Sequence, residues 1–312
     1  MENFALARFD LIITPKETLL LPAYKGSTLR GGFGHAFKRV VCANRVGRCE
    51  DCLLKEKCVY AYVFETPVPK DTEVMRKYPS APHPFVIEPP LDNRREFGKE
   101  DELTFGLVLI GRAIDYLPYF IFTFEELGRI GLGRGRGKYF LKEVRDGQGK
   151  IIYSGREKTL REDFWIIKPA ALEFPSSSSL TLSFLTPTRI KHQERLTKDI
   201  RFHILIRTLL RRAFLLSYFH CDKNWKPDFS TLIPASEKVI IEKEDLIWYD
   251  WQRYSARQDT RMKLGGFVGE VTYTGEQLKD FSPYILLGKY IHVGKGATFG
   301  LGKYEYAAAI ER

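Results

Sequence analysis

Four of the five cysteines in this chain fall between residues 42 and 58, a clustering that suits a metal site. Cys42, Cys49, Cys52 and Cys58 form the pattern C-x6-C-x2-C-x5-C. Four thiolates can converge on one zinc ion at about 2.3 Å, and the Cys49/Cys52 pair has the spacing of a chelating turn. The charged residues between them cannot form an apolar core, so we predict a structural zinc ion that orders this insert.

The alternatives to zinc are two disulfides or scattered free thiols. The first residues, MENFALARFD, contain charges and no long apolar run, so we expect no secretory signal. A cytoplasmic location follows from this expectation. It disfavours disulfides, because cytosolic thiols are kept reduced.

A second candidate centre is the segment KGSTLRGGFGHAFKR at residues 25–39. In a helix, His35, Lys38 and Arg39 share one face, opposite an aromatic stripe. A histidine beside cations suits RNA cleavage, because a base must take the 2′-OH proton while cations stabilise the phosphorane. The alternative is a histidine with only a surface or packing role. Each glycine in the helix costs about 1 kcal/mol relative to alanine, so we expect a close contact with the sheet or with a ligand backbone.

Two glycine-rich turns also carry cations, GLGRGRG at residues 131–137 and GKGATFGLG at residues 294–302. If the first turn is extended, one side of it is backbone without side chains, which a ligand can approach closely. The arginines on the other side can bind phosphates. Neither turn fits the dinucleotide fingerprint, because a helix precedes and a strand follows each one. The alternative is a flexible, solvated loop. The predicted RNA-binding cations in and near these turns are Arg134, Arg136, Lys138, Arg189, Lys191, Lys295 and Lys303.

The other histidines are weaker candidates. His192 follows two cations and could touch RNA, and His292 precedes the second glycine turn and is a modest candidate for ligand contact. His203 and His220 lie on or at the end of a predicted helix, where a structural role is expected. His83 lies in a proline-rich segment.

The composition limits which classes of protein this chain can belong to. The 312 residues give room for two domains, and 44% of them are hydrophobic, enough to bury a core. Lys and Arg number 49 against 39 acidic residues, a formal net charge of +10, which indicates a polyanionic partner, nucleic acid before a membrane surface. Residues 204–219 are the most apolar stretch, but they contain arginines, so we predict a packed helix and no membrane span.

The chain repeats its own pattern. Residues 5–13 alternate as in a strand that ends in Thr14-Pro15, and residues 180–184 alternate in a strand that ends in Thr186-Pro187, an offset of 186 − 14 = 172. An amphipathic helix follows each strand. The first helix has Ser27 as its predicted N-cap, and the second covers residues 202–219.

Each half also closes in the same way. A strand (102–110; 263–272) leads to a helix (113–127; 276–290), then to a glycine turn and a last strand. The order β-α-β-β-α-β, present twice, predicts an α+β chain of tandem duplicated ferredoxin-like (RRM-like) domains. We place them at residues 1–160, with the zinc-binding insert at 42–58, and 161–312. Residues 67–90 are predicted as a long loop.

Duplicated halves that each end in a glycine-rich turn and a last strand resemble the RAMP superfamily of CRISPR-associated proteins. Four segments resemble one branch, the precursor CRISPR RNA-processing endoribonucleases with a four-cysteine insert. These are the glycine-rich helix, the cysteine cluster running into YAYVFE at 60–65, PFVIEPP at 84–90 and the turn at 294–302. The resemblance covers nearly the whole chain.

This resemblance implies metal-independent cleavage of CRISPR repeat RNA, with no cofactor for catalysis. The 2′-OH attacks its own phosphate and leaves a 2′,3′-cyclic phosphate and a 5′-OH. Relatives use a histidine near the first helix with a tyrosine and a lysine, and the matching positions are His35, Tyr24 and Lys38. Other CRISPR effector subunits are implied partners. The alternatives are a catalytically inactive RNA-binding RAMP subunit of an effector complex and a zinc-dependent DNA-binding regulator.

Overall fold

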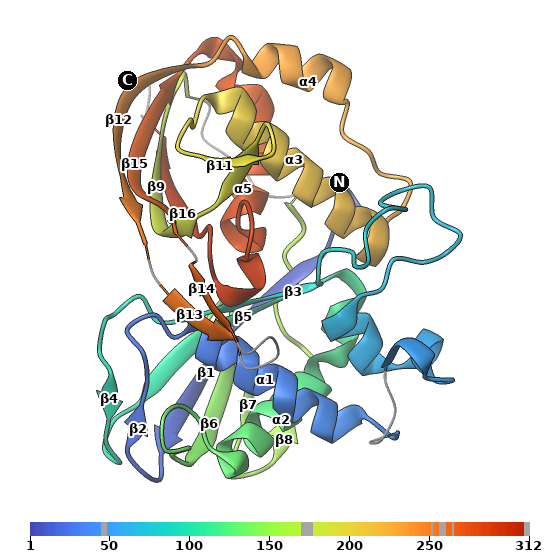
Figure 1. The fold of residues 1–312 in the computed structure, drawn as a ribbon, viewed down its shortest axis with the longest axis vertical. Coiled ribbons are helices and arrows are strands. Elements are labelled where there is room, and N and C mark those ends of the chain that lie inside the picture. The colour runs from blue at the N-terminus through green and yellow to red at the C-terminus, as the bar shows by residue number, and fades with distance from the viewer. Residues whose placement is uncertain (45–48, 170–176, 251, 256–259, 264, 309–312) are drawn as a thin grey trace. The chain divides into compact units, whose positions relative to one another are not determined.

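The computed structural model describes residues 1–44, 49–169, 177–250, 252–255, 260–263 and 265–308 (Figure 1). The chain divides into two compact units. The N-terminal unit holds residues 5–167 and 219–221, and the C-terminal unit holds residues 1–4, 168–218 and 222–312.

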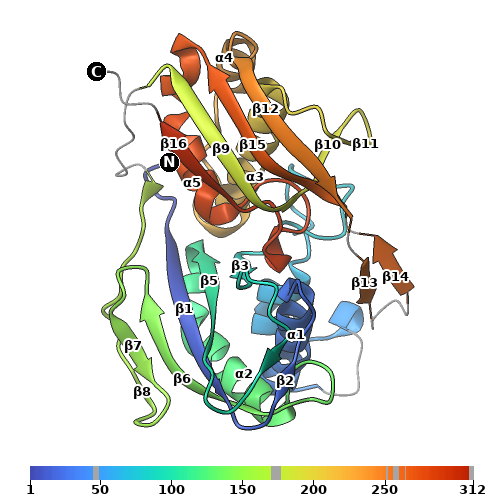
Figure 2. The ribbon, with the colours of Figure 1, turned by 90° about the vertical axis from the view of Figure 1, so that its left-hand side faces the viewer.

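The N-terminal unit is built on a six-stranded sheet in the order β3-β5-β1-β6-β7-β8, in which every neighbouring pair is antiparallel. Helices α1 and α2 pack against each other and cover one face of this sheet (Figure 2). Alternate residues of β1 are fully buried beneath them, as the period-two pattern predicts. The elements are β1 (Leu6–Pro15), α1 (Gly26–Val41), β3 (Phe85–Glu88), β5 (Leu103–Ile110), α2 (Leu117–Ile130), β6 (Tyr139–Asp146), β7 (Ile151–Ser154) and β8 (Thr159–Leu160).

Short elements complete this unit. β2 (Leu19–Leu20) and β4 (Glu96–Phe97) pair with each other. The cysteine insert contains two 3-10 turns, η1 (Cys49–Asp51) and η2 (Lys55–Lys57), and a π-helical turn, η3 (Ala61–Glu65), follows it. The 3-10 helix η4 (Gly111–Tyr116) leads into α2.

The C-terminal unit is built on a four-stranded sheet in the order β12-β15-β9-β16. Figure 2 shows this sheet with α3 and α5 behind it. The main elements are β9 (Ser179–Thr188), α3 (Phe202–His220), α4 (Phe229–Ser236), β12 (Ile240–Tyr249), β15 (Gly266–Thr274), η6 (Glu276–Phe281), α5 (Ser282–Ile291), η7 (Ala297–Phe299) and β16 (Tyr304–Ala308). Two hairpins are added, β10 (Ile190–His192) with β11 (Arg195–Thr197), and β13 (Gln252–Ser255) with β14 (Thr260–Lys263).

The two units share their order of elements. Each has the predicted β-α-β-β-α-β succession, and the four strands of that succession lie in the order second, third, first, fourth. Their last strands are fixed alike. The buried hydroxyl of Tyr139 donates to Phe124 O at 2.7 Å, and that of Tyr304 donates to Ile285 O at 2.7 Å. Each of these two tyrosines therefore belongs to a core.

Two local predictions are wrong. Residues 67–90 are not all loop, because residues 85–88 form the fully buried strand β3. Ser27 is not an N-cap, because α1 begins at Gly26 with Lys25 before it. The buried Lys25 ammonium explains this start, since it donates to Asp92 O at 2.8 Å and to Asp92 Oδ1 at 3.0 Å and so anchors the first turn of α1.

The described residues contain no helix with both the length and the apolar character that a membrane crossing requires.

Candidate functional site

His35 lies on the solvent-facing side of α1. Its neighbours Ala36 and Phe37 are fully buried in the core, whereas the His35 side chain is exposed. Gly31 lies one helical turn earlier on the same face, and a methyl group placed on it would meet no atom within 4 Å. An exposed imidazole therefore lies beside a stretch of helix backbone that no side chain covers.

Packing explains two of the three glycines in the middle of α1. A methyl group on Gly34 would overlap the ring of Phe64, and one on Gly32 would lie 3.1 Å from Leu127 of α2. The prediction of a close contact is thus met at these positions by side chains of the protein itself. Gly31 alone has no packing reason, so the expectation of a ligand near the helix backbone rests on it.

The other predicted catalytic side chains are more constrained than His35. The Lys38 ammonium lies 5.8 Å from the centre of the Tyr60 ring, and Lys38 is half-buried. Tyr24 is half-buried, and burial raises the pKa of its hydroxyl far above the ordinary value. The neighbouring Arg39 pairs with Glu126 of α2 at 3.4 Å. With its pKa raised, the Tyr24 hydroxyl is suited to hydrogen bonding rather than to ionising near neutral pH.

The first glycine turn is folded, so the extended conformation that we considered for it is not present. Gly131, Gly133 and Gly135 have φ of 97°, 77° and 82°, and Arg136 also has a positive φ of 54°. Side chains at residues 131, 133 and 137 would overlap neighbouring carbonyl oxygens, so these glycines permit the tight path of the chain. Within the turn, Leu132 packs towards Gly32, which brings the turn against α1.

The cations of this turn differ in whether a nearby carboxylate offsets their charge. Arg134 and Arg136 are exposed, and no carboxylate among the described residues pairs with either of them. Lys138 is also exposed, but its ammonium lies 3.7 Å from a carboxylate oxygen of Glu17. The two arginines are therefore the cations of this turn with charge to offer a phosphate.

The second glycine turn lies in the C-terminal unit and packs against Arg189. The Lys295 backbone N–H donates to Arg189 O at 2.9 Å, and the Lys295 side chain is exposed. Arg189 is half-buried, its Nε donates to Gly265 O at 3.1 Å, and burial lowers its pKa. Lys191 forms an ion pair with Glu194, and Lys303 is half-buried. The backbones of Arg189 and Lys295 are therefore adjacent, in a different unit from Arg134 and Arg136.

Two other histidines have structural surroundings. His292 is fully buried with φ of 61°, and its Nδ1 lies 3.1 Å from Leu301 O, so it is not placed for the ligand contact that we considered. His220 is buried as expected. Its Nε2–H donates to Pro82 O at 2.7 Å, which leaves Nδ1 to accept from the Tyr62 hydroxyl at 3.1 Å.

Sequence reasoning missed a cluster beside α1 that fixes Arg30. The Thr66 hydroxyl lies within hydrogen-bonding distance of the carbonyls of Tyr62 and Val63, so His83 Nδ1–H donates to Thr66 Oγ1 at 2.7 Å. His83 Nε2 then accepts from Arg30 at 3.4 Å. The Arg30 guanidinium also lies 4.3 Å from the centre of the Phe64 ring. These residues are distant in the sequence, so no local spacing signals the cluster.

The four cysteines are half-buried thiols in the N-terminal unit. The pKa of Cys49 is raised, first by burial, and the charges of Glu65, Cys42 and Cys58 act in the same direction while Lys38 opposes them. Cys49 therefore lies close enough to Cys42 and Cys58 to feel their charges. Residues 45–48, between Cys42 and Cys49, lie outside the described part of the chain. Among the residues that are described, no three His, Cys, Asp or Glu side chains are arranged to hold a metal ion.

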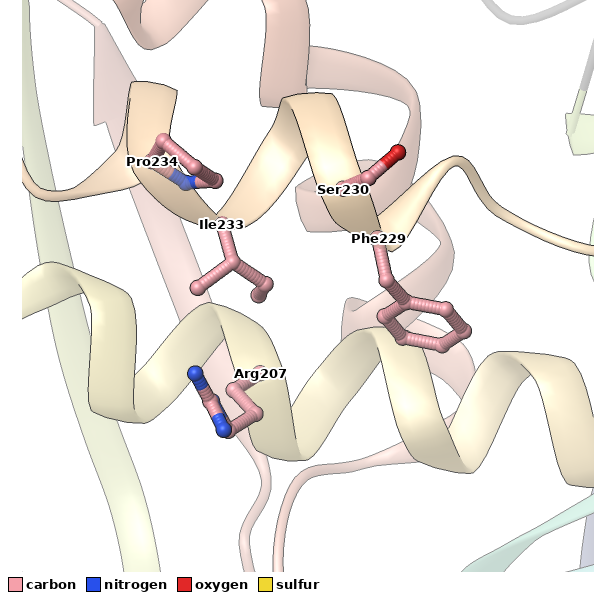
Figure 3. Close-up of a pocket in the computed structure, with 5 residues that line it drawn as sticks. All are labelled: Arg207, Phe229, Ser230, Ile233 and Pro234. Atoms are coloured by element: carbon pink, nitrogen blue, oxygen red, sulfur yellow. The ribbon is translucent and has the colours of Figure 1, made fainter.

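A shallow pocket of about 480 Å³ lies between α3 and α4 in the C-terminal unit (Figure 3). Its five lining residues are Arg207, Phe229, Ser230, Ile233 and Pro234. This lining contains no histidine, carboxylate or thiol. The pocket therefore offers neither acid–base nor metal-binding chemistry, and we do not place the site there.

Two family models match this chain. A model described as an N-terminal domain matches residues 4–164, which is more than half of the chain, and a model described as the CRISPR-associated endoribonuclease Cas6 matches residues 182–304. An uncharacterized protein from Archaeoglobus fulgidus is 27% identical over 289 residues, which cover 90% of this chain and 91% of that protein.

Solved structures of similar fold include Cas6 proteins. A Cas6 product complex has a TM-score of 0.61 at 17% identity and matches 97% of this chain and 100% of its own. Thermus thermophilus Cas6 has a TM-score of 0.57 at 16% identity, with 97% and 99% covered. A partial Cas6-RT-Cas1–Cas2 complex has a TM-score of 0.60 at 14% identity, and there the match covers 99% of this chain but only 47% of the other.

Proposed function

Residues 182–304 match the family model of the CRISPR-associated endoribonuclease Cas6, and from this premise we propose that the chain is a Cas6-type RAMP protein that binds and cleaves precursor CRISPR repeat RNA. The observation that carries the proposal is the exposed His35 of α1 beside the uncovered backbone of Gly31. The two β-α-β-β-α-β units act, in this proposal, as duplicated ferredoxin-like RNA-binding domains.

His35 is the general base or acid of the proposed reaction. A 2′-OH attacks the adjacent phosphate, its proton passes to a base, and the 5′-oxygen of the next nucleotide leaves as a hydroxyl, which gives a 2′,3′-cyclic phosphate. An imidazole suits either proton transfer near neutral pH. Lys38 lies on the same helix, one turn after His35, and would stabilise the charge of the phosphorane.

RNA binding is assigned to the cations of the two glycine turns. Arg134 and Arg136 carry charge that no described carboxylate offsets, and they lie on the turn that packs against α1. Arg189 and Lys295 form the second set. We expect all of them to contact phosphates, which position the RNA without reading its sequence. CRISPR repeat RNA and other CRISPR effector subunits are the proposed partners.

Zinc, if bound by Cys42, Cys49, Cys52 and Cys58, would have a structural role. Four thiolate ligands complete a tetrahedral site and leave no position for a catalytic water. The thiols must move together to form such a site, and the ion would then order the insert that precedes η3. The proposed cleavage chemistry uses no step at this metal.

The test is cleavage of labelled repeat RNAs in EDTA, with end-group analysis of the products. We expect cutting at one position, with a cyclic phosphate on the 5′ product. A repeat with a 2′-deoxy nucleotide at that position is the matched substrate control and should bind without being cut. Cleavage that persists on the deoxy substrate would refute 2′-OH attack. Binding without cleavage of any repeat would favour the inactive RNA-binding subunit instead.

A further inference from the structure

β12 is an edge strand of unusual length and exposure. It spans ten residues at the end of the C-terminal sheet, and it pairs only with β15 among the described strands (Figure 2). Ile240 and Ile247 are 61% and 62% exposed, more than any other large hydrophobic residue described in this unit. A long, exposed, partly apolar edge is a template for pairing with another strand.

The register of β12 against β15 assigns its side chains to faces. Ile240 pairs with Thr274, Lys243 with Thr272, Asp245 with Glu270 and Ile247 with Val268. On β15, Val271 and Tyr273 are buried beneath the helices, so the alternate positions 268, 270, 272 and 274 face away from them. A bulge at residue 242 lets Ile240, Lys243, Asp245 and Ile247 all point to this open face of the sheet.

We propose that β12 pairs antiparallel with β12 of a second copy of this chain, with a two-fold axis beside Glu244. Antiparallel neighbours related by such an axis keep the same face, so only open-face residues meet open-face residues. In this register Lys243 of each copy lies opposite Asp245 of the other. Beyond the bulge, Ile240 of each copy lies opposite Ile247 of the other. Two four-stranded sheets then form one continuous sheet.

Self-complementarity is the reason for choosing a second copy. Charges and a bulge at an edge normally discourage pairing with other strands. Here Lys243 and Asp245 carry opposite charges and lie opposite each other across the two-fold axis, and no ion pair of Asp245 is found within the described part of the chain. Pairing would also cover the two most exposed isoleucines of the unit with each other. The one unfavourable meeting is Glu244 with Glu244 at the axis.

The test begins with the mass of the protein in solution across a concentration series, by light scattering and sedimentation. A dimer has twice the chain mass, 2 × 36.1 = 72.2 kDa. Lys243→Asp and Asp245→Lys should each shift the protein to monomer, because like charges then face each other. The double variant Lys243→Asp/Asp245→Lys should restore the dimer. Lys279→Glu, an exposed charge change on η6, is the control and should leave the mass unchanged.

Two further variants test the axis. Glu244→Gln should tighten the dimer, because it removes the like-charge pair. Glu244→Cys should form a disulfide-linked dimer under mild oxidation, because opposite residues in an antiparallel pair have Cα atoms about 4.5–5.5 Å apart, within the range for a disulfide. The parent protein and Lys279→Cys should form none. A monomer at all concentrations, a dimer that ignores both single charge changes, or no cross-linking at residue 244 would each overturn the proposal.

Discussion

The two units differ in the helix that follows their first strand. α1 has three glycines in its middle and an exposed histidine, whereas α3 has no glycine and its histidine at the C-terminal end is buried. In the N-terminal unit the glycine at the helix contact is Gly32 of α1, which receives Leu127. In the C-terminal unit the contact is reversed, because Gly288 of α5 receives Leu209 of α3.

This difference separates scaffold from chemistry. Both units reach the same strand order and fix the last strand with a buried tyrosine hydroxyl, so the shared features serve folding. Of the two helices, only α1 has bare backbone at a glycine, Gly31, and an exposed imidazole. We therefore expect catalysis from the N-terminal unit and RNA binding from both.

The largest expected effect concerns His35. His35→Ala should lower the single-turnover cleavage rate by ~10²–10⁴-fold, the usual range for loss of a general acid or base, and leave RNA affinity nearly unchanged. His203→Ala, at a half-buried histidine of α3 in the other unit, is the control and should retain the parent rate. A fall of less than about tenfold for His35→Ala would make His35 structural and would remove the proposed difference between the two units.

The cysteine insert has no counterpart in the C-terminal unit, and its metal content is the next test. We expect about one zinc per chain in protein purified without chelator, by elemental analysis. The double change Cys49→Ser/Cys52→Ser should abolish zinc binding, and Cys221→Ser should not affect it. Full zinc retention in the double variant would rule out this site.

The glycines of α1 allow a matched comparison within one helix. Gly34→Ala should lower the free energy of unfolding by about 1–3 kcal/mol, because the methyl group overlaps the Phe64 ring. Gly31→Ala should raise it by about 0.5–1 kcal/mol, since space there is open and alanine is the better helix former. Urea unfolding measures both.

RNA cleavage then separates two roles for Gly31. If RNA backbone approaches the helix there, Gly31→Ala should weaken cleavage while it stabilises the fold. A Gly31→Ala protein that is stabilised and fully active would show that the open space is not used.

The smallest expected effect concerns the cations of the first glycine turn. Arg134→Ala and Arg136→Ala should each reduce the slope of log affinity against log salt by about 0.7, the value per phosphate contact on a single strand. Lys138→Ala should change the slope less, because Glu17 already offsets its charge. Equal slopes for all three variants would mean that the ion pair between Lys138 and Glu17 does not weaken the contact of Lys138 with RNA.

Local patterns in the sequence identified most of the elements of each unit. The alternation in β1 and β9, the helical stripes of α1 and α3, and the repeated glycine turns all depend on residues near one another in the chain. Such patterns report which face of an element is apolar, and they located five of the six elements of each β-α-β-β-α-β succession but not the second strands, β3 and β12. They did not reveal β3, whose four buried residues follow a proline-rich stretch with too few positions for a period to be visible.

The candidate site needed the tertiary structure, because its properties depend on residues far apart in the sequence. The sequence shows three glycines in the middle of α1, but only the packed fold shows that Phe64 and Leu127 account for two of them and leave Gly31 open. It shows six histidines, but only long-range contacts decide that His292 and His220 are buried while His35 is exposed. Residue type and spacing determine which chemistry is available, and burial by distant segments decides which side chains can perform it.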